Sequence, residues 1–201
     1  MECRLKLSSI RELFTASVVW LSRIGHCRGF GIQSPGDYWF VRYVINEHWP
    51  YYQYSTLGKG DDWLTQKVGR LLFRIANWRQ PSVIDCSAYQ EYLQAGSRKA
   101  VLRRQEPEYS SMQGTATKSG GQETMDLVVL MPEGDCRSRL AYIYNKVKSD
   151  SVLIVVNIRK AKDLWSEIVA DERSVITFDL YYCGIVLFDK KRHKQSYIVN
   201  F

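Results

Sequence analysis

The chain has 201 residues, a formal net charge of +7, and 45% hydrophobic and 24% charged residues. This length suits one domain with a sizeable core, and thirteen tyrosines and six tryptophans argue against disorder. The five cysteines are odd in number and form no CxxC pair, which argues against a disulfide framework or a zinc site and favours a reducing, cytoplasmic location.

The first eighty residues predict helices. Residues 5–24 have a loose helical pattern, and Ser34-Pro35 followed by Asp37 is a typical helix start, for a helix to about Glu47. A longer helix is expected from Asp61 or Asp62 to Arg79. We therefore expect residues 1–80 to form a helical extension packed on a domain of residues 81–201.

From residue 81 the pattern changes. Short apolar runs occur at 83–86, 100–102, 126–131 and 152–156, with helical segments at 137–148 and 160–170. Continuous apolar strands that alternate with helices predict a parallel sheet covered on both faces. Three further strands at 174–182, 184–189 and 195–201 leave no room for helices and predict an antiparallel edge. The expected fold class is α/β and Rossmann-like, with residues 106–124 as a polar loop.

The partners suggested by charge and hydropathy are limited. The basic residues are dispersed, and their densest run, residues 189–194, is typical of a solvated turn, so nucleic acid is not an expected partner. The apolar stretch 13–21 is too short to span a membrane, and no membrane partner is expected. A homo-oligomer or a protein partner stays open.

Three stretches carry a resemblance to a known family: residues 29–35 with the aromatic residues 49–52, residues 163–168 with 177–180 and 184–188, and residues 194–201. They are similar to class I S-adenosylmethionine-dependent methyltransferases, in a small bacterial branch like the catechol O-methyltransferase-like enzymes. The resemblance implies a methyltransferase fold and S-adenosylmethionine as the cofactor.

The family's cofactor loop is an acidic residue, any residue, a glycine and further small residues, because the backbone must approach the cofactor closely. On this chain Asp85 matches the acid, Ser87 replaces the first glycine, and Tyr89 stands near the second. The ring of Tyr89 would occupy the volume that the cofactor needs. Glu106, twenty-one residues after Asp85, matches the carboxylate expected to bind the ribose.

Metal-assisted relatives bind Mg²⁺ or Ca²⁺ through acidic residues after the fourth and fifth strands. Here Asn157 is the one residue at a matching position, Arg159 and Lys160 bring positive charge, and Glu133 and Asp135 are out of register, so no metal is expected. No catalytic residue is assigned, since no acid is placed to orient any of the three histidines: His26, His48 and His193.

Two hypotheses follow. In the first, the chain is a methyltransferase-fold protein with a degenerate cofactor loop, weakly active or non-catalytic, with an interaction or structural role and Tyr89 filling its crevice. In the alternative, it is an active S-adenosylmethionine-dependent methyltransferase for a small molecule, with an atypical loop and with Asp85 and Glu106 on the cofactor. The alternative requires an open pocket at the carboxyl ends of the strands at 83–86 and 152–156.

Overall fold

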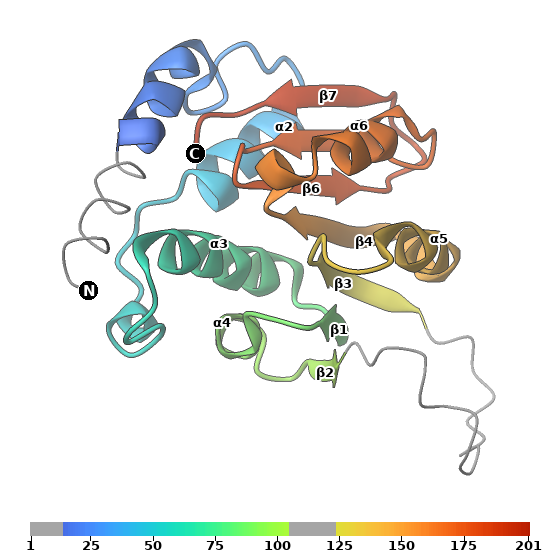
Figure 1. Ribbon diagram of the computed structural model, residues 1–201, viewed down its shortest axis with the longest axis horizontal. Helices are drawn as coiled ribbons and strands as arrows, with labels where there is room; N and C mark the ends of the chain where they lie inside the picture. Colours follow the sequence, from blue (N-terminus) through green and yellow to red (C-terminus); the bar gives the residue numbers. More distant parts are fainter. Residues whose placement is uncertain (1–13, 105–123) are drawn as a thin grey trace.

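A computed structural model describes residues 14–104 and 124–201 (Figure 1). Glu106 and the predicted loop 106–124, except for Thr124, therefore lie outside the described residues, as does the first part of the predicted helix 5–24. Among the described residues, no helix is both long and apolar enough to cross a membrane.

The centre of the molecule is a seven-stranded sheet in the order β2-β1-β3-β4-β6-β5-β7. Its strands are β1 (Val83–Cys86), β2 (Val101–Arg104), β3 (Met125–Leu130), β4 (Val147–Val156), β5 (Ile176–Asp179), β6 (Cys183–Leu187) and β7 (Gln195–Ile198). β1 is parallel to β2 and β3, β3 is parallel to β4, and β5 is parallel to β7, whereas β6 is antiparallel to both of its neighbours. The protein therefore has an α/β fold with a mostly parallel sheet.

Helices connect and cover these strands. They are residues 14–22, α2 (Pro35–Phe40) with a π-helical continuation over Val41–Ile45, α3 (Trp63–Arg79), α4 (Gln90–Gly96), α5 (Cys136–Lys146) and α6 (Lys162–Ala170), with 3₁₀ turns at Ile24–His26, Tyr52–Ser55 and Ile158–Lys160. The expected start signals act as caps: the Ser34 side chain accepts from the Asp37 amide, and Asp62 Oδ1 accepts from the Thr65 amide at 2.8 Å. Gln80, with φ of 46°, ends α3 in the left-handed conformation.

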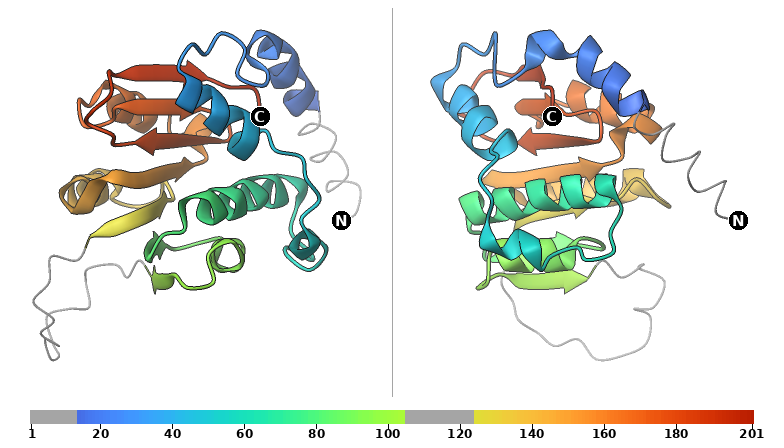
Figure 2. Two further views of the ribbon diagram at one scale, coloured as in Figure 1. Left: turned by 180° about the vertical axis from the view of Figure 1, so that it is seen from behind. Right: turned by 90° about the vertical axis from the view of Figure 1, so that its left-hand side faces the viewer.

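Helices cover both faces of the sheet (Figures 1 and 2), and alternate strand residues divide the core between these faces. Leu127, Ile154 and Phe178 pack with residues of α2, α3 and α4. Val128 and Leu153 face the other side, with residues of α5 and α6. Successive side chains of a strand point to opposite faces of the sheet, and here both faces are buried. Apolar side chains are therefore needed at every position, and the strands appear in the sequence as continuous apolar runs.

The C-terminal strands differ from the prediction in one respect. β5 and β6 form the expected antiparallel pair, but β7 pairs with β5 rather than with β6, and so runs parallel to β5. In the sheet, β5 lies between β6 and β7, and β6 runs in the opposite direction to both. The prediction of an antiparallel edge is therefore wrong for the outermost pair, β5 and β7, which is parallel.

The basic run at 189–194 is only partly solvated. Arg192 pairs with the carboxylate of Asp37, which is 1% exposed, and the Tyr197 hydroxyl donates to the same carboxylate oxygen at 3.1 Å. These contacts fasten the start of α2 to β7 and the turn before it. Arg192 therefore has a structural partner that the charge pattern did not indicate.

The helix at 14–22 lies close to the C-terminal end of the described chain (Figure 1), and side-chain contacts join the two. Arg23 forms an ion pair with Asp179 at 2.9 Å, and Asn200 Nδ2 donates to the Trp20 carbonyl at 3.0 Å. An isolated parallel bridge between Cys27 and Asn200 adds to this junction. The N-terminal helix therefore packs at the end of the sheet where β5 stops and β6 begins.

Candidate functional site

The turn between β1 and α4 is where the sequence predicts the cofactor loop. Asp85 lies near the end of β1 and is 3% exposed, and Arg139 of α5 donates to its Oδ2 at 2.5 Å. A buried carboxylate is costly unless it is paired, so this ion pair allows Asp85 to remain in the core. The carboxylate predicted to serve a cofactor thus has a protein partner from a helix on the other face of the sheet.

Ser87 and Tyr89 differ in backbone conformation. Ser87 is exposed and is not among the described residues with positive φ, which meets the condition under which a serine can replace the glycine. Tyr89, at the N-cap of α4, has φ of 61° and ψ of 24°, a left-handed conformation that glycine adopts most easily. The loop therefore has a glycine-like backbone near the position where the resemblance implies the second glycine.

The side chain of Tyr89 lies inward. Its ring is half-buried against the core cluster that includes α3 and α4, and lies 6.3 Å from the ring of Tyr92. Burial raises the pKa of the phenol, with a smaller contribution from Cys183, and the nearby side chain of Thr65 in α3 lowers this pKa. Cys183 pairs with Val156, the last residue of β4. The ring therefore reaches from the β1 end toward α3 at the carboxyl edge of the parallel strands.

Of the other residues considered from the sequence, Glu106 lies outside the described residues. Asn157 follows β4 in a left-handed conformation, and Arg159 lies 5.4 Å from the centre of the Tyr182 ring. Asp135 caps α5 by accepting from the Ser138 amide at 3.2 Å. Within residues 14–104 and 124–201, no group of three or more His, Cys, Asp or Glu side chains could hold a metal ion.

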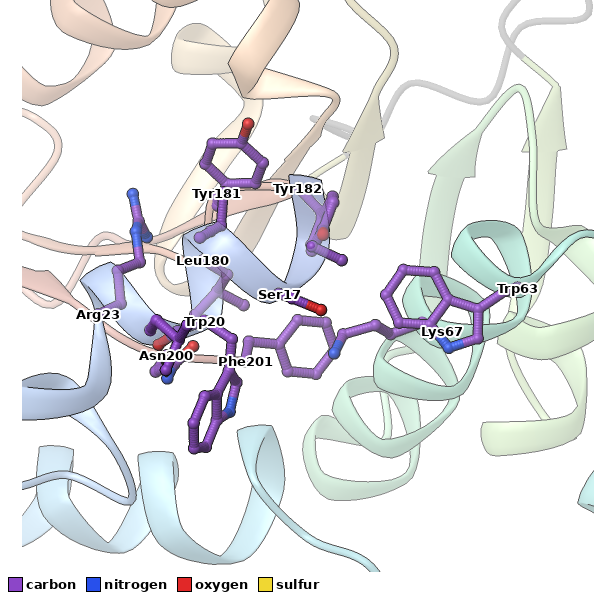
Figure 3. Close-up of a pocket in the computed structure, with 13 residues that line it drawn as sticks. Ser17, Trp20, Arg23, Trp63, Lys67, Leu180, Tyr181, Tyr182, Asn200 and Phe201 are labelled. Atoms are coloured by element: carbon purple, nitrogen blue, oxygen red, sulfur yellow. Dashed lines mark hydrogen bonds between the residues drawn. The ribbon is translucent and has the colours of Figure 1, made fainter. Parts of the chain in front are cut away.

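A pocket of about 460 Å³ lies beside this edge, and sequence reasoning missed it (Figure 3). It is formed by four segments that are distant in the sequence: the helix at 14–22 with Arg23, the start of α3, the turn between β5 and β6, and residues 200–201. Its lining residues are Ala16, Ser17, Val19, Trp20, Leu21, Arg23, Trp63, Lys67, Leu180, Tyr181, Tyr182, Asn200 and Phe201. We call it the aromatic pocket.

Two basic side chains line the aromatic pocket. Arg23 is neutralised by Asp179 and lies 5.5 Å from the centre of the Tyr181 ring. Lys67 Nζ lies 5.1, 6.0 and 4.6 Å from the ring centres of Trp63, Tyr182 and Phe201. No side chain that lines the pocket is acidic. The aromatic residues were visible in the sequence, but nothing in it indicated that they would meet around a lysine.

No family model, curated protein or solved structure matches the chain. Function is therefore inferred from the side chains of the β1–α4 turn and of the aromatic pocket. The β1–α4 turn bears on cofactor binding, and the aromatic pocket bears on the binding of a different ligand.

Proposed function

We propose that the chain is a methyltransferase-fold protein of class I whose cofactor loop no longer binds S-adenosylmethionine efficiently. It is weakly active or non-catalytic, and it acts through interactions with other molecules. The resemblance and the mostly parallel sheet with the reversed strand β6 near the C terminus support the fold assignment. Helices on both faces of the sheet agree with it.

The observation that carries the proposal is Tyr89. Its backbone has the left-handed conformation of a glycine, but its ring packs inward against the core cluster. A cofactor that needs close backbone approach at this turn would have to displace the ring and remove this packing. The cost of this displacement is subtracted from the binding free energy.

The ion pair of Asp85 supports the same conclusion. Its Oδ2 is bound by Arg139 and the carboxylate is almost fully buried. A polar group of the cofactor that needed this oxygen would compete with a charged donor at short distance. Such charge-assisted bonds are roughly twice as strong as neutral ones.

Calorimetric titration with S-adenosylmethionine and S-adenosylhomocysteine tests the proposal. We expect no saturable binding at submillimolar concentration by the unmodified protein, and binding tighter by about tenfold or more for Tyr89→Gly, because the ring is removed and the backbone conformation is retained. Tyr181→Gly is the matched control, since Tyr181 is also a tyrosine with positive φ, 70°, but belongs to the turn between β5 and β6. This control should bind neither compound.

Two results would overturn the proposal. Submillimolar binding of S-adenosylmethionine to the unmodified protein, abolished by Glu106→Ala, would instead support the active methyltransferase for a small molecule. No gain for a well-folded Tyr89→Gly variant would mean that the ring is not what excludes the cofactor.

A further inference from the structure

The aromatic pocket contains a cation that has no acidic partner in the described part of the chain. Arg23 is matched by Asp179, but no ion pair of Lys67 is found among residues 14–104 and 124–201. Burial lowers the pKa of the Lys67 ammonium, and the two neighbours that also influence this pKa, Cys183 and Arg74, are not carboxylates. A partly desolvated ammonium with three N–H donors is stabilised by an anion placed next to it.

The walls of the pocket suit a flat apolar molecule. Trp20 and Trp63 are 49% and 51% exposed, so a large aromatic surface at the pocket is still open to a ligand. In Figure 3 the side chain of Lys67 extends from α3 toward the ring of Phe201, with Trp20 and Trp63 on either side. The volume of about 460 Å³ lies within the range of small-molecule sites, roughly 300 to 1,000 Å³.

We propose that the aromatic pocket binds a small aromatic carboxylate, with the ligand's carboxylate on Lys67 Nζ and its ring against Trp20 and Trp63. The rings of Tyr182 and Phe201 hold the ammonium from the side by cation–π contact and leave N–H donors for the ligand. This inference goes beyond the proposed function and does not depend on it, since neither Asp85 nor Tyr89 lines the pocket.

The chemistry distinguishes this ligand from two simpler ones. An inorganic anion could contact Lys67 but would leave the aromatic walls exposed. A neutral aromatic molecule could stack on the walls but would leave the ammonium without a charge partner. An aromatic carboxylate satisfies both parts, so removal of either part should weaken binding.

The test is calorimetric titration of the full chain with phenylacetate, phenylacetamide and inorganic phosphate. We expect phenylacetate to bind with a submillimolar Kd and the other two to bind at least about tenfold more weakly, since each lacks one half of the recognition. Lys67→Gln and Trp63→Ala should each weaken phenylacetate binding by about tenfold, whereas Lys67→Arg should retain it. Lys146→Gln is the matched control, because Lys146 also lies over an aromatic ring, that of Tyr142 at 5.8 Å, but outside the pocket.

Several outcomes would overturn the proposal: no saturable binding of phenylacetate, equal binding of the acid and the amide, or unchanged binding by Lys67→Gln. Thermal melting of each variant establishes that it is folded, and retained binding by Lys67→Arg shows that loss in Lys67→Gln is a loss of charge. The result is separable from the cofactor test, since Tyr89→Gly should bind phenylacetate like the unmodified protein.

Discussion

Tyr89 and Tyr181 both have a left-handed backbone, and both lie at the edge of the sheet where β1, β4 and β5 end. A bulky residue in this conformation costs about 1 kcal/mol or more, and such residues cluster at functional sites. Tyr89 gains core packing in return. Tyr181 packs its ring edge-on against Tyr182 at 5.1 Å and lines the aromatic pocket.

Substitution of Arg139 tests how much its ion pair with Asp85 contributes to the stability of the fold. Arg139→Met removes the cation that pairs with Oδ2 of this buried carboxylate, and we expect a loss of about 2–4 kcal/mol in the free energy of unfolding. Urea denaturation measures it. The matched variant is Asp85→Asn/Arg139→Met, which removes both charges and should recover more than half of the loss. If the single and double variants are equally unstable, the ion pair is not the source of the effect.

At the scale of the elements, α3 and α4 form a closely packed pair. Gly96 at the end of α4 lies so near α3 that a Cβ atom there would overlap the carbonyl oxygen of Phe73. At Gly69 of α3 a Cβ atom would overlap the ring of Tyr92. Two glycines thus allow the helices to approach and bring Thr65 within reach of Tyr89.

Gly96→Ala should therefore lower the free energy of unfolding by about 1–3 kcal/mol, because a backbone atom cannot yield as a flexible side chain does. The matched control is Gly36→Ala in the first turn of α2, where a Cβ atom would meet nothing within 4 Å. That variant should be neutral or slightly stabilising, since alanine has the higher helix propensity. Equal effects of the two substitutions in urea denaturation would contradict the close packing.

At the scale of the whole molecule, buried phenols make stability depend on alkaline pH. Burial and a hydrogen bond to Glu47 raise the pKa of Tyr51 to about 12, and burial raises the pKa values of Tyr54 and Tyr144. A raised folded pKa means that the stabilisation is fully present below the unfolded pKa, about 10, and is lost as pH rises toward the folded value. Proton binding to phenols thus favours the folded state between pH 10 and about 12.

We expect the urea midpoint to fall between pH 9.5 and 11.5 and to fall less steeply in Tyr51→Phe, which has no proton to lose at this position. The comparison uses slopes against pH, because Tyr51→Phe also loses the bond to Glu47, 2.8 Å long, at every pH. Tyr52→Phe is the control, since Tyr52 is 76% exposed and should leave the slope unchanged. Identical slopes for Tyr51→Phe and the unmodified protein would contradict the prediction.

Local patterns in the sequence predicted where helices and strands occur better than they predicted which of them lie side by side in the fold. Asp62 and the apolar face of residues 64–76 located α3, and the apolar runs located β1, β3 and β4. Strand periodicity contains no information about which strand is adjacent, so the predicted antiparallel edge did not include the parallel pairing of β7 with β5. The partner of Asp85 was missed for a similar reason, since Arg139 is 54 residues away on another helix.

The candidate sites also differ in whether a short stretch of sequence could predict them. The replacement of glycine by Tyr89 was visible in a short loop, and the left-handed backbone agrees with it. The aromatic pocket joins residues near 20, 65, 181 and 201, and no local pattern links such positions. The methyltransferase fold, the fate of the cofactor and the role of Glu106 stay predictions.

The position of β6 has a consequence for the order in which the chain can fold during synthesis. The two strands that pair with β5 are β6 and β7, and both leave the ribosome after it. Until residues 183–187 have emerged, β5 has no neighbour in the sheet, although Ile176 and Phe178 are fully buried in the finished protein. A nascent chain paused at this point therefore presents an apolar strand to chaperones.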